Sequence, residues 1–320
     1  MERKTTFYPT GAFYKGNLHL HSTVSDGKLP VSALKDAYKE RGYQFIVYSE
    51  HNIYSSYADI NESDFIVVPG FEAEFRKEPE DWRVYHLIML PGPAALRAQA
   101  KEPFLEHMEE IPIRQLEDIA SVQKLIDDMR ARGYMVMINH PYWSTIEYDE
   151  ILPLTGLFAV EVYNHCSEVV ENMGRSDACW DALLRRDMRI WGTATDDNHN
   201  EAPFDHPNND SFGGWVCVKA NSLSEQDICE ALHDGSFYSS QGPEIYDFYL
   251  EGNKATVKCS PVNGIYFRGD NRQVGIKIAP EGENSLTTLE YTLKGTETYI
   301  RVDCIDAKGK RAWSNPIFVK

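Results

Sequence analysis

Up to about residue 245, short and nearly continuous apolar runs alternate with stretches that repeat apolar residues at helical spacing. Such runs are typical of strands that are buried on both faces of a sheet. They predict strands at 16–21, 44–49, 65–68, 84–90, 134–138, 157–162, 189–194 and 215–218. Helices are predicted after Pro30, where a proline suits the first turn, and at 115–132 and 225–233. Strands and helices that alternate in this number favour a parallel β/α barrel.

Two parts of the chain depart from this alternation. Residues 91–113 contain proline and glutamate without a clear period, and we interpret them as an insertion. After Gly242-Pro243 only turn signals and short strand-like runs remain, at 255–259, 273–278, 289–293 and 299–305. Residues 246–320 hold 11 Lys/Arg and 9 Asp/Glu, whereas the rest of the chain holds 21 and 40. We therefore predict two units, a barrel over 1–243 and a small antiparallel, sandwich-like β domain over 244–320.

Composition narrows the class of protein. The 320 residues are 42% hydrophobic and 25% charged, which excludes a disordered or fibrous chain. The net charge of −17 disfavours a nucleic acid as partner, because its backbone attracts a basic surface. No apolar run reaches the roughly 18 residues of a membrane span, and the first residues lack the apolar core of a secretory signal. We therefore expect no membrane partner and a cytoplasmic location. The six cysteines are scattered and form no C-x-x-C pair, which favours reduced thiols.

Polar residues that can bind metals stand where the apolar runs end. In His19-Leu20-His21 the two histidines are two positions apart, so an extended strand points both to the same side. Asp197 and His199 share this spacing and would do the same if their backbone stays extended. In a barrel the strand ends meet at one face, where active sites lie. Six histidines and three carboxylates are therefore expected around one pocket: His19, His21, Asp26, His51, Glu72, His86, His140, Asp197 and His199.

This set of residues predicts a metal site. A single histidine at a strand end is more often structural, but six at separate ends are hard to explain by packing. Burying so many imidazoles and acids without cations would be costly. A carboxylate in the middle of the set can bridge two cations, and nine ligands suffice for two or three. The mixture of imidazole and carboxylate suits divalent Zn, Mn or Fe and does not choose among them.

The order of the motifs resembles the PHP (polymerase and histidinol phosphatase) superfamily. The motifs are H-x-H-x(4)-D at 19–26, S-E-H-N at 49–52, P-G-x-E at 69–72, the isolated His86, N-H-P at 139–141 and D-D-x-H at 196–199, within roughly residues 14–240. The resemblance implies a distorted (β/α)7, TIM-like barrel with a trinuclear metal centre. It also implies a hydrolase acting on phosphoric ester bonds, with a small phosphorylated molecule as substrate.

The resemblance further implies how the nine residues share the metals. One metal would be held by His19, His21, Glu72 and Asp197. A second would be held by Asp26, His51 and His199. The third would be held by Glu72, His86 and His140, with Glu72 bridging. The attacking group would be a metal-bound hydroxide held by Glu72, Asp197 and His199.

Residues beside these motifs are expected to line the mouth of the pocket, although each could equally be a packing or surface residue. Tyr142 and Trp143 follow His140 directly, and Glu161 lies in the strand that ends near Asn164. The candidate substrate contacts are Tyr142, Trp143, Asn164, His165, Arg175 and His206.

Two other functions are compatible with the sequence. The first is an exonuclease or phosphodiesterase on nucleic acid or nucleotides, against which the acidic barrel argues. The second is a non-catalytic binding protein in which metals stabilise the barrel and the C-terminal β domain recognises a partner through Tyr266, Phe267 and Trp313. The complete ligand set favours the enzyme. The substrate, the preference for monoester or diester, the native metal and the oligomeric state are left open.

Overall fold

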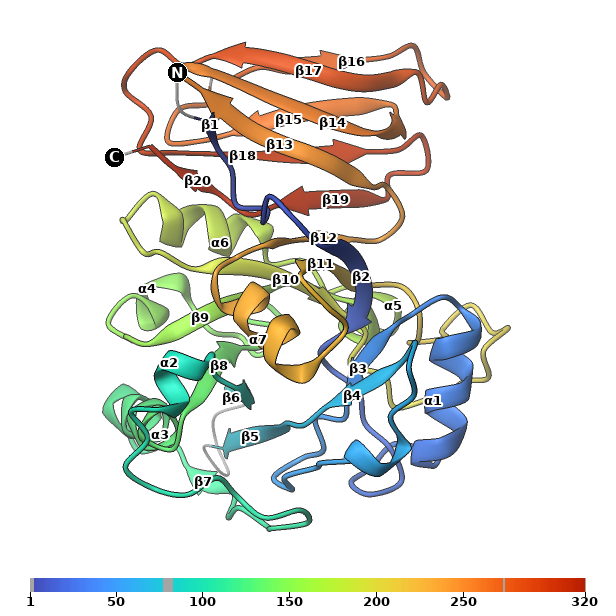
Figure 1. Cartoon of the computed structure of the whole chain (residues 1–320), viewed down its shortest axis with the longest axis vertical. Coiled ribbons are helices and arrows are strands. Elements are labelled where there is room, and N and C mark those ends of the chain that lie inside the picture. Colours follow the sequence, from blue (N-terminus) through green and yellow to red (C-terminus); the bar gives the residue numbers. More distant parts are fainter. Residues whose placement is uncertain (1–2, 77–82, 273, 320) are drawn as a thin grey trace.

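The computed structural model describes residues 3–76, 83–272 and 274–319. Within these residues the strands form three hydrogen-bonded sheets, and the helices flank two of them (Figure 1). The chain is thus a mixed α/β protein with extensive sheets, as the alternation of strands and helices predicts.

A six-stranded sheet contains the middle strands of the chain, in the order β10-β9-β8-β6-β5-β7. Its members are β5 (Phe71–Arg76), β6 (Val84–Pro91), β7 (Arg114–Gln115), β8 (Tyr134–Ile138), β9 (Leu157–Asn164) and β10 (Trp191–Thr195). β8, β9 and β10 pair in parallel, whereas β6 runs antiparallel to both β5 and β8.

A ten-stranded sheet joins the start of the chain to its end, in the order β16-β15-β18-β19-β12-β11-β2-β3-β4, with β20 beside β18. Its first members are β2 (Ala12–Asn17), β3 (Phe45–Val47), β4 (Ile66–Val68), β11 (Trp215–Ala220) and β12 (Phe237–Ser240). The others are β15 (Gly264–Arg268), β16 (Ile276–Ile278), β18 (Tyr299–Ile305), β19 (Arg311–Ser314) and β20 (Ile317–Phe318).

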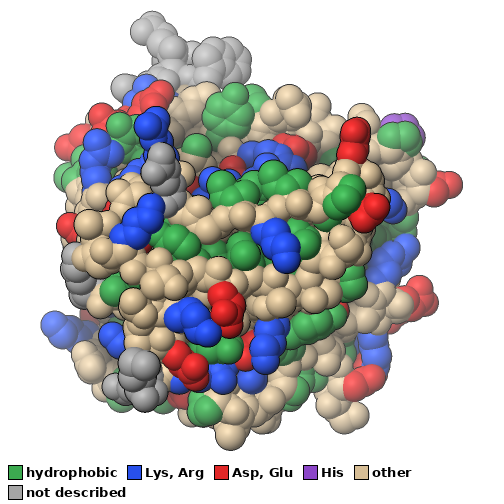
Figure 2. All heavy atoms as spheres, turned by 90° about the horizontal axis from the view of Figure 1, so that it is seen from above, with side chains coloured by type: hydrophobic (Ala, Val, Ile, Leu, Met, Phe, Trp, Pro, Cys, Tyr) green, Lys and Arg blue, Asp and Glu red, His purple; other side chains and the backbone are tan. Residues whose placement is uncertain are grey.

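A four-stranded antiparallel sheet covers the C-terminal part. It consists of β1 (Arg3–Lys4), β13 (Ile245–Glu251), β14 (Lys254–Val262) and β17 (Leu286–Thr292). It packs on the C-terminal strands of the ten-stranded sheet around an apolar core that includes Phe248, Val257 and Val302. Figure 2 shows this end of the molecule, where apolar and basic side chains are interspersed.

The helices are short. They are α1 (Val31–Glu40), α2 (Ala94–Arg97), α3 (Ile119–Ala131), α4 (Tyr148–Ile151), α5 (His165–Glu171), α6 (Asp177–Leu184) and α7 (Glu225–His233), with a 3₁₀ turn η1 (Ala58–Ile60). The longest, α3, begins where the Asp118 side chain accepts a hydrogen bond from the Ser121 backbone N–H. Its buried residues Val122, Ile126 and Met129 lie on one face, as helical spacing requires. None of the helices in the described residues is long and apolar enough to span a membrane.

The distorted, TIM-like parallel barrel that we expected is not confirmed, and the described residues show no closed barrel. Hydrogen bonding in the described residues divides the expected barrel strands between two sheets. Isolated bridges, Leu20 to Asn198 and His51 to Glu72, link these two sheets. The ladder is also not parallel throughout, because β5 and β6 pair antiparallel and β2 runs antiparallel to β11. Apolar runs identify buried strands but carry no information about their direction, which explains the error.

The C-terminal strands are antiparallel, as their turn signals predict. Some of them also hydrogen-bond to strands from the first part of the chain. β12 pairs with β19, so the ten-stranded sheet crosses the expected boundary at residue 243. The apolar core around β8 and β9 also includes Tyr299 and Trp313. The division at 243/244 into two domains therefore stays a prediction. The expected strand at 273–278 begins at a residue outside the described ones, and β16 covers its last three residues.

Candidate metal centre

All nine residues expected to bind metals lie together where the two sheets meet. His19 and His21 follow β2, His51 follows β3, and His140 follows β8. Glu72 lies in β5, His86 in β6, and Asp197 and His199 follow β10. The His19 carbonyl accepts a hydrogen bond of 2.9 Å from the Asp197 backbone N–H, and the Asn52 N–H donates one of 2.7 Å to the Glu72 carbonyl. The backbone thus sets the distances between ligands from opposite sheets.

The first group surrounds His19 and is fully within the protein. His19 Nε2 lies 3.0 Å from Asp197 Oδ1 and 3.2 Å from Glu72 Oε1. His21 Nε2 lies 3.0 Å from the same Asp197 oxygen and 3.5 Å from Glu72 Oε2. One ligand atom from each of these four side chains lies within 4.8 Å of the others. This is the set that the PHP resemblance implies for one metal.

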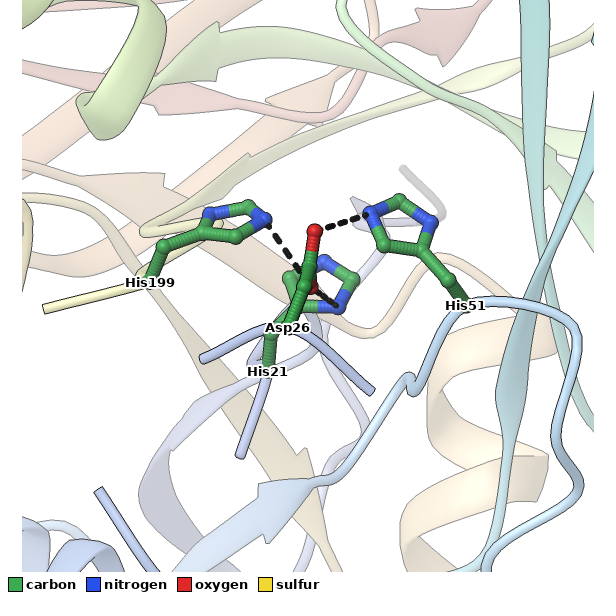
Figure 3. Close-up of side chains that lie close together, drawn as sticks. All are labelled: His21, Asp26, His51 and His199. Atoms are coloured by element: carbon green, nitrogen blue, oxygen red, sulfur yellow. Dashed lines mark ion pairs between the residues drawn. The ribbon is translucent and has the colours of Figure 1, made fainter. Parts of the chain in front are cut away.

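The second group brings the side chains of His21, Asp26, His51 and His199 together (Figure 3). Asp26 is 54% exposed at its side chain, and its oxygens lie 3.4 Å from His199 Nε2 and 3.7 Å from His51 Nε2. His21 Nδ1 lies 3.9 Å from Asp26 Oδ1. His21 therefore lies between the first and second groups.

The third group also gathers around Glu72. Glu72 Oε1 lies 3.3 Å from His86 Nδ1 and 3.5 Å from His140 Nε2, and Oε2 lies 3.0 Å from His51 Nδ1. The Glu72 side chain is fully buried and belongs to both the first and the third group. A carboxylate in this position can bridge two cations.

The ligand atoms converge without bonding to one another. Five buried atoms make no hydrogen bond with any residue that the structure describes: His19 Nε2, His21 Nδ1, His21 Nε2, His51 Nδ1 and Glu72 Oε2. Their separations from neighbouring carboxylate or imidazole atoms are short, at 2.8–3.9 Å, but they lack hydrogen-bond geometry. Buried polar atoms rarely stay unpaired because desolvation is costly. Imidazole and carboxylate atoms that face a common point fit divalent cations.

The carboxylates of the site raise the pKa values of two candidate ligand histidines. Burial lowers the pKa of the His51 imidazole, but the carboxylates of Glu72 and Glu74 outweigh it and raise that pKa to about 11. Burial likewise lowers the pKa of His199, but the nearby carboxylates of Asp26 and Asp197 outweigh it and raise that pKa to about 9. The carboxylates therefore attract positive charge, which protons supply when no metal is bound.

Three histidines are oriented by hydrogen bonds on Nδ1. His19 Nδ1 donates to Glu161 Oε1 at 3.0 Å, and His199 Nδ1 donates to the Asp197 carbonyl at 3.0 Å. His140 Nδ1 bonds to Ser144 Oγ at 2.9 Å. Each of these rings therefore presents Nε2 to the ligand cluster. Such partners fix the ring and raise its basicity as a metal ligand.

Glu161 is the supporting residue whose role the sequence did not reveal. We expected it at the mouth of the pocket, but it is buried. Besides His19, it accepts hydrogen bonds from the His140 backbone N–H at 2.8 Å, from Asn164 Nδ2 at 2.9 Å and from the Thr195 hydroxyl. The sequence did contain one signal of this role, because an acid inside an otherwise apolar strand is rarely buried without partners.

Two further carboxylates support the open side of the site. Glu74 Oε1 lies 2.8 Å from His51 Nδ1, and Glu74 is two positions after Glu72 on the same face of β5. Glu50 accepts hydrogen bonds from Ser22 and Ser25 and so holds the loop between His21 and Asp26.

The expected extended backbone at residues 197–199 is not found. Asp197 has a φ of 55°, in the left-handed region, and His140 and Asn52 also have positive φ values of 27° and 56°. Non-glycine residues held there cost of order 1–3 kcal/mol each and cluster at functional sites. Here the turns redirect the chain at the ends of β10, β8 and β3, which brings the ligands inward.

Of the six candidate substrate contacts, Trp143 and Asn164 lie close to the ligands. The Trp143 ring centroid is 4.9 Å from that of His140 and 6.0 Å from that of His86. Tyr142 is 56% exposed and points to a separate cavity. Asn164 is buried, and its Nδ2 donates to Asp197 Oδ2 at 2.9 Å, so it positions a ligand.

The other three candidates, His165, Arg175 and His206, already hydrogen-bond to other residues. Tyr163 hydrogen-bonds to His165 Nδ1 at 2.9 Å, and burial lowers the pKa of His165 to about 4. Arg175 Nε donates to Glu168 at 3.0 Å. His206 lies in a turn, where its Nδ1 accepts from the Asn208 backbone N–H at 3.0 Å. Their roles as substrate contacts stay predictions.

Comparison with known proteins gives only distant similarities. No protein-family model matches this chain, and no curated protein matches it. It is similar to a solved two-domain protein from Bacteroides vulgatus that contains a predicted PHP-like metal-dependent phosphoesterase, with a TM-score of 0.48, 13% identity, and coverage of 98% of this chain and 99% of that one.

Two other solved structures are similar over part of the chain. A provisionally named metal-dependent phosphoesterase from Bifidobacterium adolescentis has a TM-score of 0.38 and 12% identity, covering 60% of this chain and 90% of that one. An amidohydrolase from Chromobacterium violaceum, solved with sulfate and no metal, has a TM-score of 0.39 and 14% identity, covering 57% and 87%. The chain's structural neighbours thus include PHP-like metal-dependent phosphoesterases. Because every TM-score is below 0.5, these similarities carry no conclusion about the chemistry of the site.

Proposed function

We propose that this chain is a metal-dependent phosphoesterase that hydrolyses a small phosphorylated substrate. The observation that carries the proposal is the convergence of nine ligand side chains, with buried nitrogen and oxygen atoms that make no hydrogen bond with the described residues. The donor set suits two or three divalent cations, with Zn, Mn and Fe as candidates.

The arrangement of the groups fits a phosphate ester as substrate. Glu72 belongs to two ligand groups and His21 lies between two, so cations held there would be neighbours. When bound, such cations supply Lewis acidity toward phosphoryl oxygens and lower the pKa of water. The chain's own residues provide the charge and the rigidity that this requires. The three carboxylates Asp26, Glu72 and Asp197 offset the cation charge.

The supporting residues hold the ligands in place. Glu161 fixes His19 and the backbone of His140, while Asn164 holds Asp197. Asp210 accepts hydrogen bonds from the His199 backbone N–H at 2.8 Å. Because these bonds are buried, little reorganisation is needed when a substrate binds. A cytoplasmic location and a small-molecule rather than a nucleic-acid partner belong to the same proposal.

The test combines metal content with hydrolysis. The protein is purified without chelator, its metals are measured by elemental analysis, and it is assayed on a panel of phosphate monoesters and diesters. We expect two or three equivalents of metal and hydrolysis that Glu72→Gln abolishes. Glu290→Gln is the matched control, because Glu290 is 57% exposed and pairs only with Lys254 among the contacts the structure describes for its carboxylate.

Two outcomes would overturn the proposal. Full hydrolysis by Glu72→Gln would show that the reaction does not need the Glu72 carboxylate as a bridging ligand. Absence of bound metal after reconstitution with each ion would show that the nine residues do not form a metal centre. Bound metal without hydrolysis of any ester would favour the non-catalytic binding protein instead.

A further inference from the structure

A cavity of about 500 Å³ opens directly beside the exposed side of the metal centre. Two candidate ligands, Asp26 and His51, form part of its wall. The rest of the lining is Val24, Ser25, Asn52, Ile53, Glu74, Arg76, Glu110, Ile111, Pro112 and Ile113. A group attached to a phosphate at the metal centre would therefore have room here.

One wall of this cavity comes from the insertion at residues 91–113. Its last part runs beside the segment that follows His51. The Tyr54 backbone N–H donates to the Glu109 carbonyl at 3.0 Å, and the Ile111 N–H donates to the Asn52 carbonyl at 2.7 Å. Ile53 and Glu110 form an antiparallel bridge. The insertion is thus attached to the ligand segment and has a defined position at the site.

The wall supplied by the insertion is apolar except for Glu110, and it is incompletely covered. Ile113 is 52% exposed, although it lines a cavity next to charged residues. Ile53, Ile111 and Pro112 continue the same surface. An apolar wall beside a polar reaction centre is a common arrangement in small-molecule sites.

The charges of the cavity disfavour a second anion. The acids Glu74 and Glu110 line it, in addition to the ligand Asp26. Among the described residues of this lining Arg76 is the cation, and both its Nε and Nη2 lie 2.8 Å from Glu74 Oε2. Its charge is therefore already paired. A carboxylate or second phosphate placed here would meet the negative charge of Glu110.

We propose that this cavity holds the leaving group of the substrate and selects an uncharged, apolar alcohol, such as an aromatic one, against Ile113. The inference rests on the proposed function, because it takes the metal centre to hold the phosphoryl group. It adds a substrate class, phosphate monoesters of apolar alcohols, and a specificity-determining residue from the insertion.

The test uses ligands that cannot be hydrolysed, so it does not depend on activity. Binding of phenylphosphonate and methylphosphonate to the metal-loaded protein is measured by calorimetry. Burial of the ring predicts about a tenfold preference for the phenyl compound. Ile113→Ala should reduce this preference several-fold. Ile276→Ala, at an isoleucine that is 53% exposed on β16, removes the same atoms from another surface and should leave it unchanged.

A second ligand tests the charge argument. A phenylphosphonate that carries a carboxylate on the ring should bind more weakly than phenylphosphonate, and Glu110→Gln should narrow that difference. Circular dichroism confirms the fold of each variant.

Equal affinity of wild-type protein for the phenyl and methyl compounds would overturn the inference, as would an unchanged preference in Ile113→Ala. These results are distinct from a failure of the proposed function. Phenyl preference without hydrolysis of any ester would support the cavity and refute the enzyme, whereas hydrolysis without phenyl preference would refute the cavity alone.

Discussion

The buried guanidinium of Arg301 offers the sharpest test of how the C-terminal strands are attached. Arg301 lies in β18 and is fully buried. Its Nη2 and Nε lie 2.6 and 2.9 Å from Asp181 Oδ1 of α6, and its Nη1 bonds to Asp303. The stem and guanidinium pack over the Trp180 ring, 4.5 Å from its centroid. Arg301 thus connects β18 to α6.

The substitution Arg301→Met keeps the stem and removes the charge. Asp303 is 2% exposed at its side chain and would retain only the Arg268 contact at 2.9 Å among its described ion pairs. Removing one partner of a buried pair costs about 3–5 kcal/mol. Because Arg268 remains and Asp181 is 19% exposed, we expect the lower value, about 3 kcal/mol. For a chain of this length that lowers the melting temperature by about 4–5 °C.

Urea unfolding and calorimetry measure this loss, with Lys254→Met as the matched control. Lys254 pairs with Glu290 at 3.1 Å, but the two side chains are 48% and 57% exposed. Such a pair contributes less than about 1 kcal/mol. If Arg301→Met were no less stable than Lys254→Met, the reasoning about the buried pair would be refuted.

Three further predictions concern the metal centre. Glu161→Gln should lower metal affinity by about 10- to 100-fold, because His19 loses its carboxylate partner, and chelator competition measures this; unchanged affinity would contradict it. Metal affinity should rise with pH through the neutral range and beyond, because the pKa values of His51 and His199 are raised to about 11 and about 9. Both imidazoles are then protonated at neutral pH in the metal-free protein, so metal binding releases protons. Affinities that are flat between pH 6 and 8 by calorimetry would exclude this. Chelation should lower the unfolding temperature, and metal at about 100 times its Kd should restore about 2.7 kcal/mol; identical melting curves with and without chelator would show that the ions do not stabilise the fold.

The positions of the ligand residues could be predicted from the sequence, whereas the arrangement of the strands could not. The motif at His19 and His21 depends only on alternation along one strand. The direction of β6 and the division into two sheets depend on pairings between distant segments, which apolar runs do not encode. The nine side chains still meet because isolated bridges such as His51 to Glu72 align the sheet edges locally.

The supporting residues were harder to predict than the ligands. Glu161 belongs to no short motif, and its partners His19, His140 and Thr195 come from three different segments. The left-handed turn at Asp197 was also not predicted, because aspartate adopts this conformation only when its surroundings impose it. Sequence patterns report local spacing, whereas these features arise from packing.

The position of the ligands at the meeting of two sheets has a consequence for the order of folding. The first metal group combines His19 with Asp197, so it forms only after segments from nearly opposite ends of the first two thirds of the chain have met. Contacts of such large sequence separation are slow to form, because loop closure must precede them. We therefore expect each sheet to acquire its hydrogen bonds before the site can capture a cation. Metal uptake during refolding would then report the docking of the two sheets.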